Sequence, residues 1–234
     1  MIEKKYIFAS CKTWHKRAFL ELQDRDSESW DWASNPDELL ELTTKISPRY
    51  IFFLHWNWKV PESIWSNFEC VCFHMTDVPF GRGGSPLQNL IALGLKETQL
   101  SALRMVEDMD AGPVYAKKKM SLHGRAEEIY LRAGLLSMEI IRSMLLGSGF
   151  EPTPQEGEPV LFKRRTPEDS LLPSAGNIEG LYDHIRMLDA PTYPLAFVEH
   201  GGFIIEFSHA ELKNGEIDAT ALIRTMGEPE GQND

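Results

Sequence analysis

The feature that most limits how this chain can fold is a stretch near its middle, residues 70–91. A short apolar run, Cys70 to Phe73, ends in a histidine, and a loop rich in proline and glycine follows it. Strands of α/β folds commonly end in this way, because the loop after a strand is where such folds place reactive side chains. The stretch therefore predicts a buried strand and then a functional loop. Ser85-Pro86 predicts the N-cap and first position of a helix that follows the loop.

The rest of the chain alternates between predicted strands and predicted helices. Before the central stretch we expect strands at 5–9, around Trp30 and Trp32 and at 50–54, and helices at 14–22, 36–46 and 62–65. After it we expect strands at 99–106 and 113–120 and a long amphipathic helix at 124–146. This alternation is typical of βαβ units. The predicted fold class is therefore α/β, with a Rossmann-like, mainly parallel sheet.

Composition divides the chain into a main part and a smaller C-terminal part. Residues 1–148 form the predicted catalytic domain, and a segment rich in proline, glycine and glutamate at 149–159 is predicted to be a linker. Residues 160–212 form a predicted small α+β subdomain with a strand, a helix and a hairpin. Residues 213–234 are predicted to be a polar tail, disordered from residue 227.

Charge and composition limit the partners that we expect. The chain has 35 acidic and 24 basic residues, for a net charge of −11, and such a field opposes polyanions, so we expect no nucleic acid partner. We also expect no membrane partner, since no apolar run approaches the ~18 residues that a spanning helix needs. Three cysteines give neither a disulfide framework nor the spacing of a metal site, so we expect no metal and a cytoplasmic location. The sequence leaves open whether the chain forms a homodimer.

Five motifs stand in one order: His74, Thr76-Asp77-Val78-Pro79, Arg82-Gly83-Gly84, Ser85-Pro86-Leu87-Gln88 and Asp110-Ala111-Gly112. In order and spacing they resemble the motifs of the folate-dependent formyltransferase family. One position departs from that pattern, because the family's asparagine falls on Cys72. The resemblance implies the formyltransferase fold and an enzyme that moves a formyl group from the co-substrate 10-formyltetrahydrofolate to an amine.

The resemblance also implies the catalytic residues. Asp110 would orient and charge-balance His74, and His74 would donate to the formyl oxygen or move protons from the attacking amine. Cys72 is a weak donor, so backbone amides, Asn57 or His74 alone would hold the oxyanion. An alternative is that Cys72 is a nucleophile that accepts the formyl group.

The implied folate-binding positions lie in the loops around these residues. The alternative to folate binding is a turn cap for Asp77 and a salt bridge at the loop edge for Arg82. The full set is Thr76, Asp77, Val78, Pro79, Arg82, Ser85, Pro86, Leu87, Gln88, Met105 and Val106.

An acceptor site is predicted at the end of a neighbouring strand. His55, Trp56, Asn57 and Trp58 directly follow the apolar run 50–54, and Lys12 follows the first strand. The carboxyl ends of strands bind ligands in open α/β sheets. The alternative is a tryptophan-rich rim that packs on the next helix. Candidate cations for phosphate contacts are Lys12, Arg164, Arg165 and Arg186.

The central motifs together with His55-Trp56-Asn57-Trp58 look most like the sugar N-formyltransferases of the pseudaminic acid type. The predicted acceptor is therefore the primary amine of a nucleotide-linked amino sugar, a 4-amino-4,6-dideoxy sugar, in surface-polysaccharide biosynthesis. Two alternatives stay open within the family, methionyl-tRNA and a carrier-bound aminoacyl group. A third, suggested by Cys72, is a folate-binding protein without catalytic activity.

Overall fold

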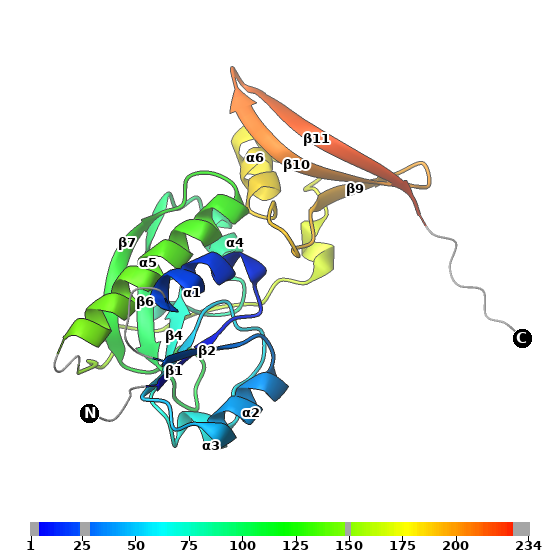
Figure 1. Ribbon diagram of the computed structural model, residues 1–234. Coiled ribbons are helices and arrows are strands. Elements are labelled where there is room, and N and C mark those ends of the chain that lie inside the picture. Colours follow the sequence, from blue (N-terminus) through cyan, green and yellow to red (C-terminus); the bar gives the residue numbers. More distant parts are fainter. Residues whose placement is uncertain (1–4, 24–28, 148–150, 227–234) are drawn as a thin grey trace, which may run out of the picture. The chain divides into compact units, whose positions relative to one another are not determined.

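The computed structural model describes residues 5–23, 29–147 and 151–226, which fall into two compact units (Figure 1). The first unit comprises Met1–Pro86, Glu97–Ser121 and Tyr130–Lys163. The second comprises Leu87–Lys96, Leu122–Ile129 and Arg164–Asp234. The chain passes between the units several times, so neither unit is one continuous segment.

The first unit is built on a six-stranded sheet with the strand order β2-β1-β3-β4-β6-β7. Its strands are β1 (Lys5–Ala9), β2 (Ser29–Ala33), β3 (Tyr50–Phe53), β4 (Cys70–His74), β6 (Glu97–Arg104) and β7 (Val114–Ser121). The first four run parallel, whereas β6 is antiparallel to β4 and β7 is antiparallel to β6. The predicted α/β class with a mainly parallel sheet is confirmed.

The two faces of this sheet carry different side chains, because successive residues of a strand point to opposite sides. On one face, aliphatic residues of β1 and β3 pack with Leu39 of α2 (Pro36–Lys45) and Ile64 of α3 (Glu62–Trp65). On the other face, Phe8 meets the ring of Phe19 from α1 (Lys16–Gln23), edge to face at 5.8 Å. A short 3₁₀ turn, η1 (Thr13–His15), joins β1 to α1.

The loop after β4 contains a short strand that the sequence did not predict. This strand, β5 (Phe80–Gly83), pairs in parallel with β8 (Val160–Phe162), so β8 belongs to the first unit and not to the C-terminal subdomain. The sequence could not reveal this pairing, because β5 is rich in glycine and has no hydrophobic alternation. The predicted linker also lies along the first unit, where Thr153 exchanges two backbone hydrogen bonds with Val114.

The second unit contains α6 (Ile178–Arg186) and an antiparallel sheet with the strand order β11-β10-β9. Those strands are β9 (Ala196–His200), β10 (Phe203–Lys213) and β11 (Glu216–Thr225), and η2 (Pro167–Ser170) precedes them. Two pieces of helix also belong to this unit: α4 (Pro86–Ala92) without its first residue, and the first turn of α5 (Ala126–Leu146). Arg186 ties α6 to the segment just before α5, because its guanidinium donates to the backbone oxygens of Leu122 and Gly124, each at 2.7 Å.

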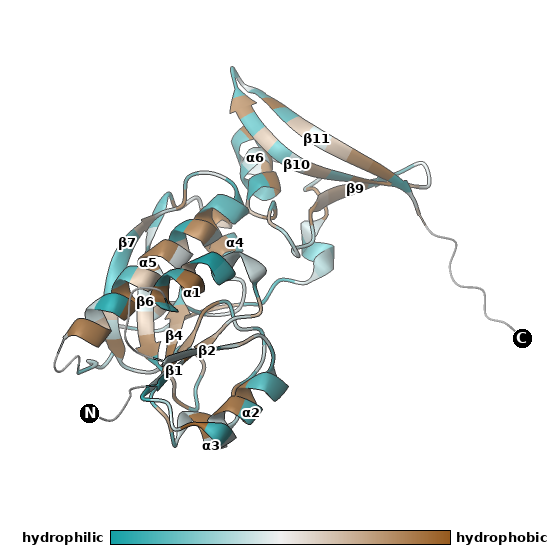
Figure 2. Ribbon diagram, viewed as in Figure 1, coloured by the Kyte–Doolittle hydropathy of each residue, from teal (hydrophilic) through white to brown (hydrophobic). Residues whose placement is uncertain are grey.

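The predicted polar tail is wrong for residues 216–225, which form β11. Asn214 and Gly215 both have positive φ, 53° and 78°, as a tight two-residue hairpin turn requires. The Asn-Gly pair was a hairpin signal in the sequence, but the polar composition around it hid the strand. Figure 2 shows hydrophobic residues interleaved with hydrophilic ones along β10 and β11. The predicted disorder from residue 227 lies outside the described residues.

Candidate active site

His74 ends β4, and only 7 % of it is exposed. Its Nε2 lies 2.8 Å from the backbone oxygen of Gly81. A carbonyl oxygen can only accept a hydrogen bond, so Nε2 must carry the hydrogen in this arrangement. In the neutral ring, Nδ1 is then the unprotonated nitrogen, and it lies 3.6 Å from Oδ2 of Asp110. A proton on Nδ1 would therefore face a carboxylate.

Asp110 reaches His74 by a route that the sequence argument did not foresee. The sequence predicts a strand at 99–106 shortly before Asp110, but β6 is antiparallel to β4 and its last residue, Arg104, pairs with Val71. The chain after β6 must therefore extend back along β4 before Asp110 can meet His74. Asp110 has a positive φ of 54°, and its Oδ2 accepts the backbone N–H of Gly83 at 2.9 Å.

Gln155 holds this turn in place, and no sequence motif pointed to it. Its Nε2 donates to the backbone oxygens of Asp110 and Gly112, at 2.8 and 2.7 Å. Its Oε1 accepts two bonds from the guanidinium of Arg82, at 3.0 and 2.8 Å. Arg82 is thus tied to the Asp110 turn through the amide of Gln155. This role differs from both sequence interpretations of Arg82, which were a folate-binding residue and a salt bridge at the loop edge. A glutamine in a proline-rich connection carries no catalytic signature, so only the fold could bring it here.

The loop after His74 is fixed by its own hydrogen bonds. The Gly81 oxygen accepts Thr76 Oγ1 at 3.2 Å as well as His74, and Ser101 Oγ donates to the Thr76 oxygen at 2.7 Å. Lys117 binds the Asp77 carboxylate and the Val78 oxygen. Asp77 therefore has a cation partner on β7, which favours the turn-stabilising interpretation over catalysis. The Val78–Pro79 peptide bond is cis.

At two of the other proposed folate positions, the side chain is held by contacts with residues of its own unit. Gln88 is fully buried in the second unit, where it donates to the Met187 oxygen at 3.0 Å and accepts from Tyr193 at 3.1 Å. Met105 packs against the aliphatic face of the sheet. Three more of these positions differ in their surroundings: Leu87 is buried, Val106 is 36 % exposed, and Ser85, just before Pro86, has a positive φ of 49°.

Cys72 lies on β4, and burial and the neighbouring Asp110 charge together raise the pKa of its thiol far above the ordinary value. The thiol is then protonated at neutral pH. Because the thiolate is the nucleophilic form, this environment argues against formyl transfer to sulfur. It leaves Cys72 with a weak S–H donor where the family has an amide.

The predicted acceptor residues divide into packed and exposed ones. His55 is turned away from solvent: its Nδ1 lies 2.7 Å from Nε2 of His15, and its ring meets Tyr130 edge to face at 4.8 Å. Trp56 packs on the aliphatic cluster and, at 5.1 Å, on Trp58, which is 43 % exposed.

The remaining candidates are polar or charged. Asn57 is exposed, and Lys12 places its ammonium 5.3 Å from the centre of the Trp14 ring. Of the proposed phosphate ligands, Arg186 is buried and used to anchor α6. Arg165 donates to the backbone oxygen of Asp169. Within the described residues, no group of three or more His, Cys, Asp or Glu side chains is placed to hold a metal ion.

Comparison with known proteins gives three findings. Residues 167–224 match the family described as "Methionyl-tRNA formyltransferase, C-terminal domain". The methionyl-tRNA formyltransferase of Sorangium cellulosum is 29 % identical over 154 residues, which are 62 % of this chain and 48 % of that protein. The chain thus spans about half the length of the curated relatives that it matches.

The third finding is a solved structure, the methionyl-tRNA formyltransferase from Clostridium thermocellum. It is 41 % identical, with a TM-score of 0.91, and the match covers 95 % of this chain and 99 % of that one. The chain belongs to the formyltransferase family. HypX from Aquifex aeolicus, solved with tetrahydrofolic acid, shares the fold at 20 % identity, with a TM-score of 0.73 over 90 % of this chain and 39 % of that one.

These relatives confirm part of the predicted function and correct the rest. The enzyme class, a one-carbon transferase, and the co-substrate, 10-formyltetrahydrofolate, are confirmed at the level of the family. The predicted nucleotide-linked amino sugar is wrong, and so is the exclusion of nucleic acid, because the relatives with the highest identity here are named for methionyl-tRNA. The net charge of a whole chain does not fix the charge of the surface that meets the acceptor. The value of −11 therefore did not exclude a nucleic acid. No helix among the described residues has both the length and the apolar character needed to cross a bilayer.

Proposed function

We propose that this formyltransferase moves the formyl group of 10-formyltetrahydrofolate to the α-amine of methionyl-tRNA. The observation that carries the proposal is the 41 % identity with a methionyl-tRNA formyltransferase across almost all of both chains. The family match at residues 167–224 supports it independently, because it lies in the C-terminal unit and not in the loops around His74.

The arrangement around His74 suits acyl transfer to an amine. The attacking amine must lose a proton, and the amine that leaves the formyl group must gain one. His74 Nδ1 is the ring nitrogen that can take up a proton, since Nε2 is bonded to Gly81. Asp110, 3.6 Å away, would stabilise the imidazolium that results. His74 would then return the proton to the leaving nitrogen.

The loop after β4 fits a folate in one respect. The pterin ring of the folate is uncharged and carries several hydrogen-bond donors and acceptors, so backbone amides and carbonyls can recognise it without a basic patch. The bonds from Thr76, Ser101 and Lys117 fix the backbone of this loop before any ligand arrives. Positions Thr76 to Pro79 are proposed to bind the heterocycle, and Arg82 to hold the Asp110 turn through Gln155.

The test is an assay with methionyl-tRNA and 10-formyltetrahydrofolate, in which formylmethionine is measured after the ester is hydrolysed. Uncharged tRNA is the blank. We expect His74→Ala and Asp110→Ala to lower kcat by ~100-fold or more, the usual scale for an acid–base group. Asp108→Asn is the matched control, because this carboxylate lies exposed in the same turn. Absence of formylmethionine with the wild-type protein would refute the proposed acceptor, and normal rates in His74→Ala would refute the mechanism.

A further inference from the structure

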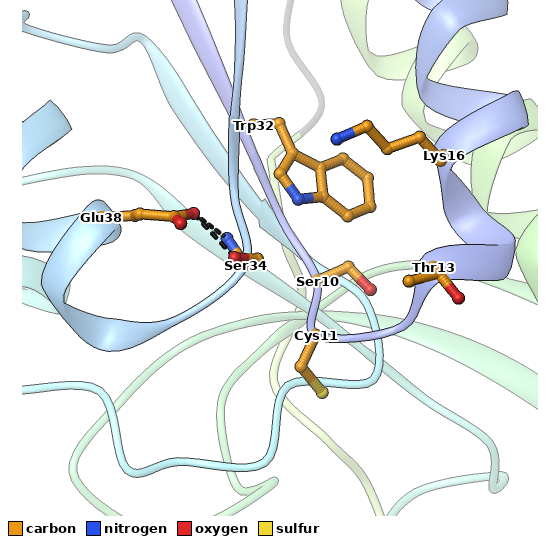
Figure 3. Close-up of a pocket in the computed structure, with 7 residues that line it drawn as sticks. All are labelled: Ser10, Cys11, Thr13, Lys16, Trp32, Ser34 and Glu38. Carbon is orange, nitrogen blue, oxygen red and sulfur yellow. Dashed lines mark hydrogen bonds between the residues drawn. The ribbon is translucent and has the colours of Figure 1, made fainter. Parts of the chain in front are cut away.

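A pocket lies at the carboxyl ends of β1 and β2, and it contains none of the residues proposed for catalysis (Figure 3). Its volume is about 530 Å³, within the roughly 300–1,000 Å³ of small-molecule sites. All of its lining residues belong to the first unit. They are Ser10, Cys11, Thr13, Lys16, Trp32, Ser34 and Glu38.

Trp32 gives the pocket a fixed aromatic surface. Its ring stacks on the buried ring of Phe8, with centres 5.2 Å apart and planes 13° apart, and meets Phe19 edge to face at 5.3 Å. These contacts hold the indole in place while the side chain remains half-buried. Lys16 places its ammonium 5.1 Å from the centre of the same ring. An indole held in this way can pack against a nucleobase, and the lysine beside it can bind a phosphate.

A carboxylate stands across the pocket from the lysine. Oε2 of Glu38 accepts the backbone N–H of Ser34 at 2.7 Å and its hydroxyl at 2.8 Å, so the side chain is oriented (Figure 3). Those bonds from Ser34, more than the charge of Lys16, hold the pKa of Glu38 below its ordinary value. The other oxygen, Oε1, takes no part in the two bonds. A carboxylate that follows the second strand of an α/β sheet is well placed to accept ribose hydroxyls.

We propose that this pocket binds the 3′-terminal adenosine of the acceptor tRNA. The base packs against Trp32, the ribose binds Glu38 and the 5′-phosphate binds Lys16. The inference rests on the proposed function, and the strand order supports it. The strand that carries His74, β4, is two places from β1 in the sheet. Two steps of roughly 4.8 Å put the pocket about 10 Å from the chemistry. The reacting amine must lie beside the formyl group and not in this pocket. The nucleoside, however, is joined to that amine through a few bonds and can reach the pocket.

The first experiment measures binding of adenosine 5′-monophosphate to the full chain by titration calorimetry. We expect Lys16→Gln and Glu38→Gln each to weaken binding at least tenfold. Arg17→Gln and Glu41→Gln are matched controls on the same two helices, with exposed side chains paired only to their own helix in the contacts Arg17–Glu21 and Glu41–Lys45. These controls should bind as the wild type does. Equal binding by all five proteins, or binding of free methionine and not of the nucleotide, would overturn the proposal.

The second experiment separates this inference from the proposed function. With methionyl-tRNA as acceptor, Lys16→Gln and Glu38→Gln should raise the KM at least tenfold and leave kcat close to the wild-type value. Unchanged KM in both variants, with good formylation, would refute the pocket and keep the function. Nucleotide binding that depends on Lys16 and Glu38, without formylation of methionyl-tRNA, would support a nucleoside site and refute the tRNA as its source.

Discussion

A buried histidine and a half-buried one, packed together beside the sheet, should make this protein sensitive to mild acid. His15, in η1, is 2 % exposed, and its Nε2 lies 2.7 Å from Nδ1 of His55. The rings stack with centres 5.0 Å apart. One hydrogen between the two nitrogens satisfies the neutral pair, whereas protonation of both rings would bring two N–H groups and two like charges into contact. Burial lowers the pKa of His15 from 6.5 to about 4, and burial followed by the nearness of His15 lowers that of His55 well below 6.5.

The sign and size of the effect follow from linkage. The folded state holds fewer protons than the unfolded state between pH 6.5 and about 4, so His15 stabilises the fold above pH 6.5 and this stability is lost as the pH falls through that window. With these pKa values, His15 alone accounts for a loss of about 2 kcal/mol in the free energy of unfolding between pH 7 and pH 5. His55 acts in the same direction.

Urea unfolding at pH 7 and pH 5 measures this loss. His15→Gln is the informative variant, because its amide stays neutral and can still donate to His55. The variant should lose about 2 kcal/mol less than the wild type over this interval. His200→Gln, an exposed histidine of β9, should follow the wild type. If the wild type and His15→Gln lost the same free energy, the reasoning from burial would be refuted.

Three other predictions concern the candidate active site. Gln155→Ala removes both side-chain bonds to the Asp110 turn, and we expect kcat to fall about tenfold, a loss of ~1.4 kcal/mol, in the formylation assay; an unchanged kcat would show that the turn holds itself. Gly112→Ala would put a methyl group 1.8 Å from the backbone oxygen of Arg104, so the free energy of unfolding in urea should fall by ~1–3 kcal/mol; an unchanged free energy of unfolding would show that the backbone moves to make room. Because its pKa is raised, the Cys72 thiol should react with iodoacetamide at pH 8 far more slowly in the folded protein than in urea, and equal rates would contradict its burial.

The sequence alone determined the first half of the fold and the identity of the central loop. Apolar runs such as 50–54 and 70–73 are local signals, and the structure has β3 and β4 at these positions. The motif order from His74 to Asp110 indicated the family, because five separate motifs agree with it in order and spacing. Which amine the enzyme formylates did not follow from those motifs. Those motifs are proposed to surround the formyl group, whereas most of the acceptor is proposed to bind at a separate pocket.

The tertiary structure decided what depends on distant pairing. The route by which Asp110 reaches His74 follows from β6 being antiparallel, and strand direction is not encoded in a single strand's composition. The support from Gln155 and the pairing of β5 with β8 join residues more than forty positions apart. The pocket beside Trp32 collects side chains from β2, from the loops after β1 and β2 and from the helices that follow them, none of which forms a motif. Such contacts arise only when the sheet forms, because it is the sheet that brings these segments to a common edge.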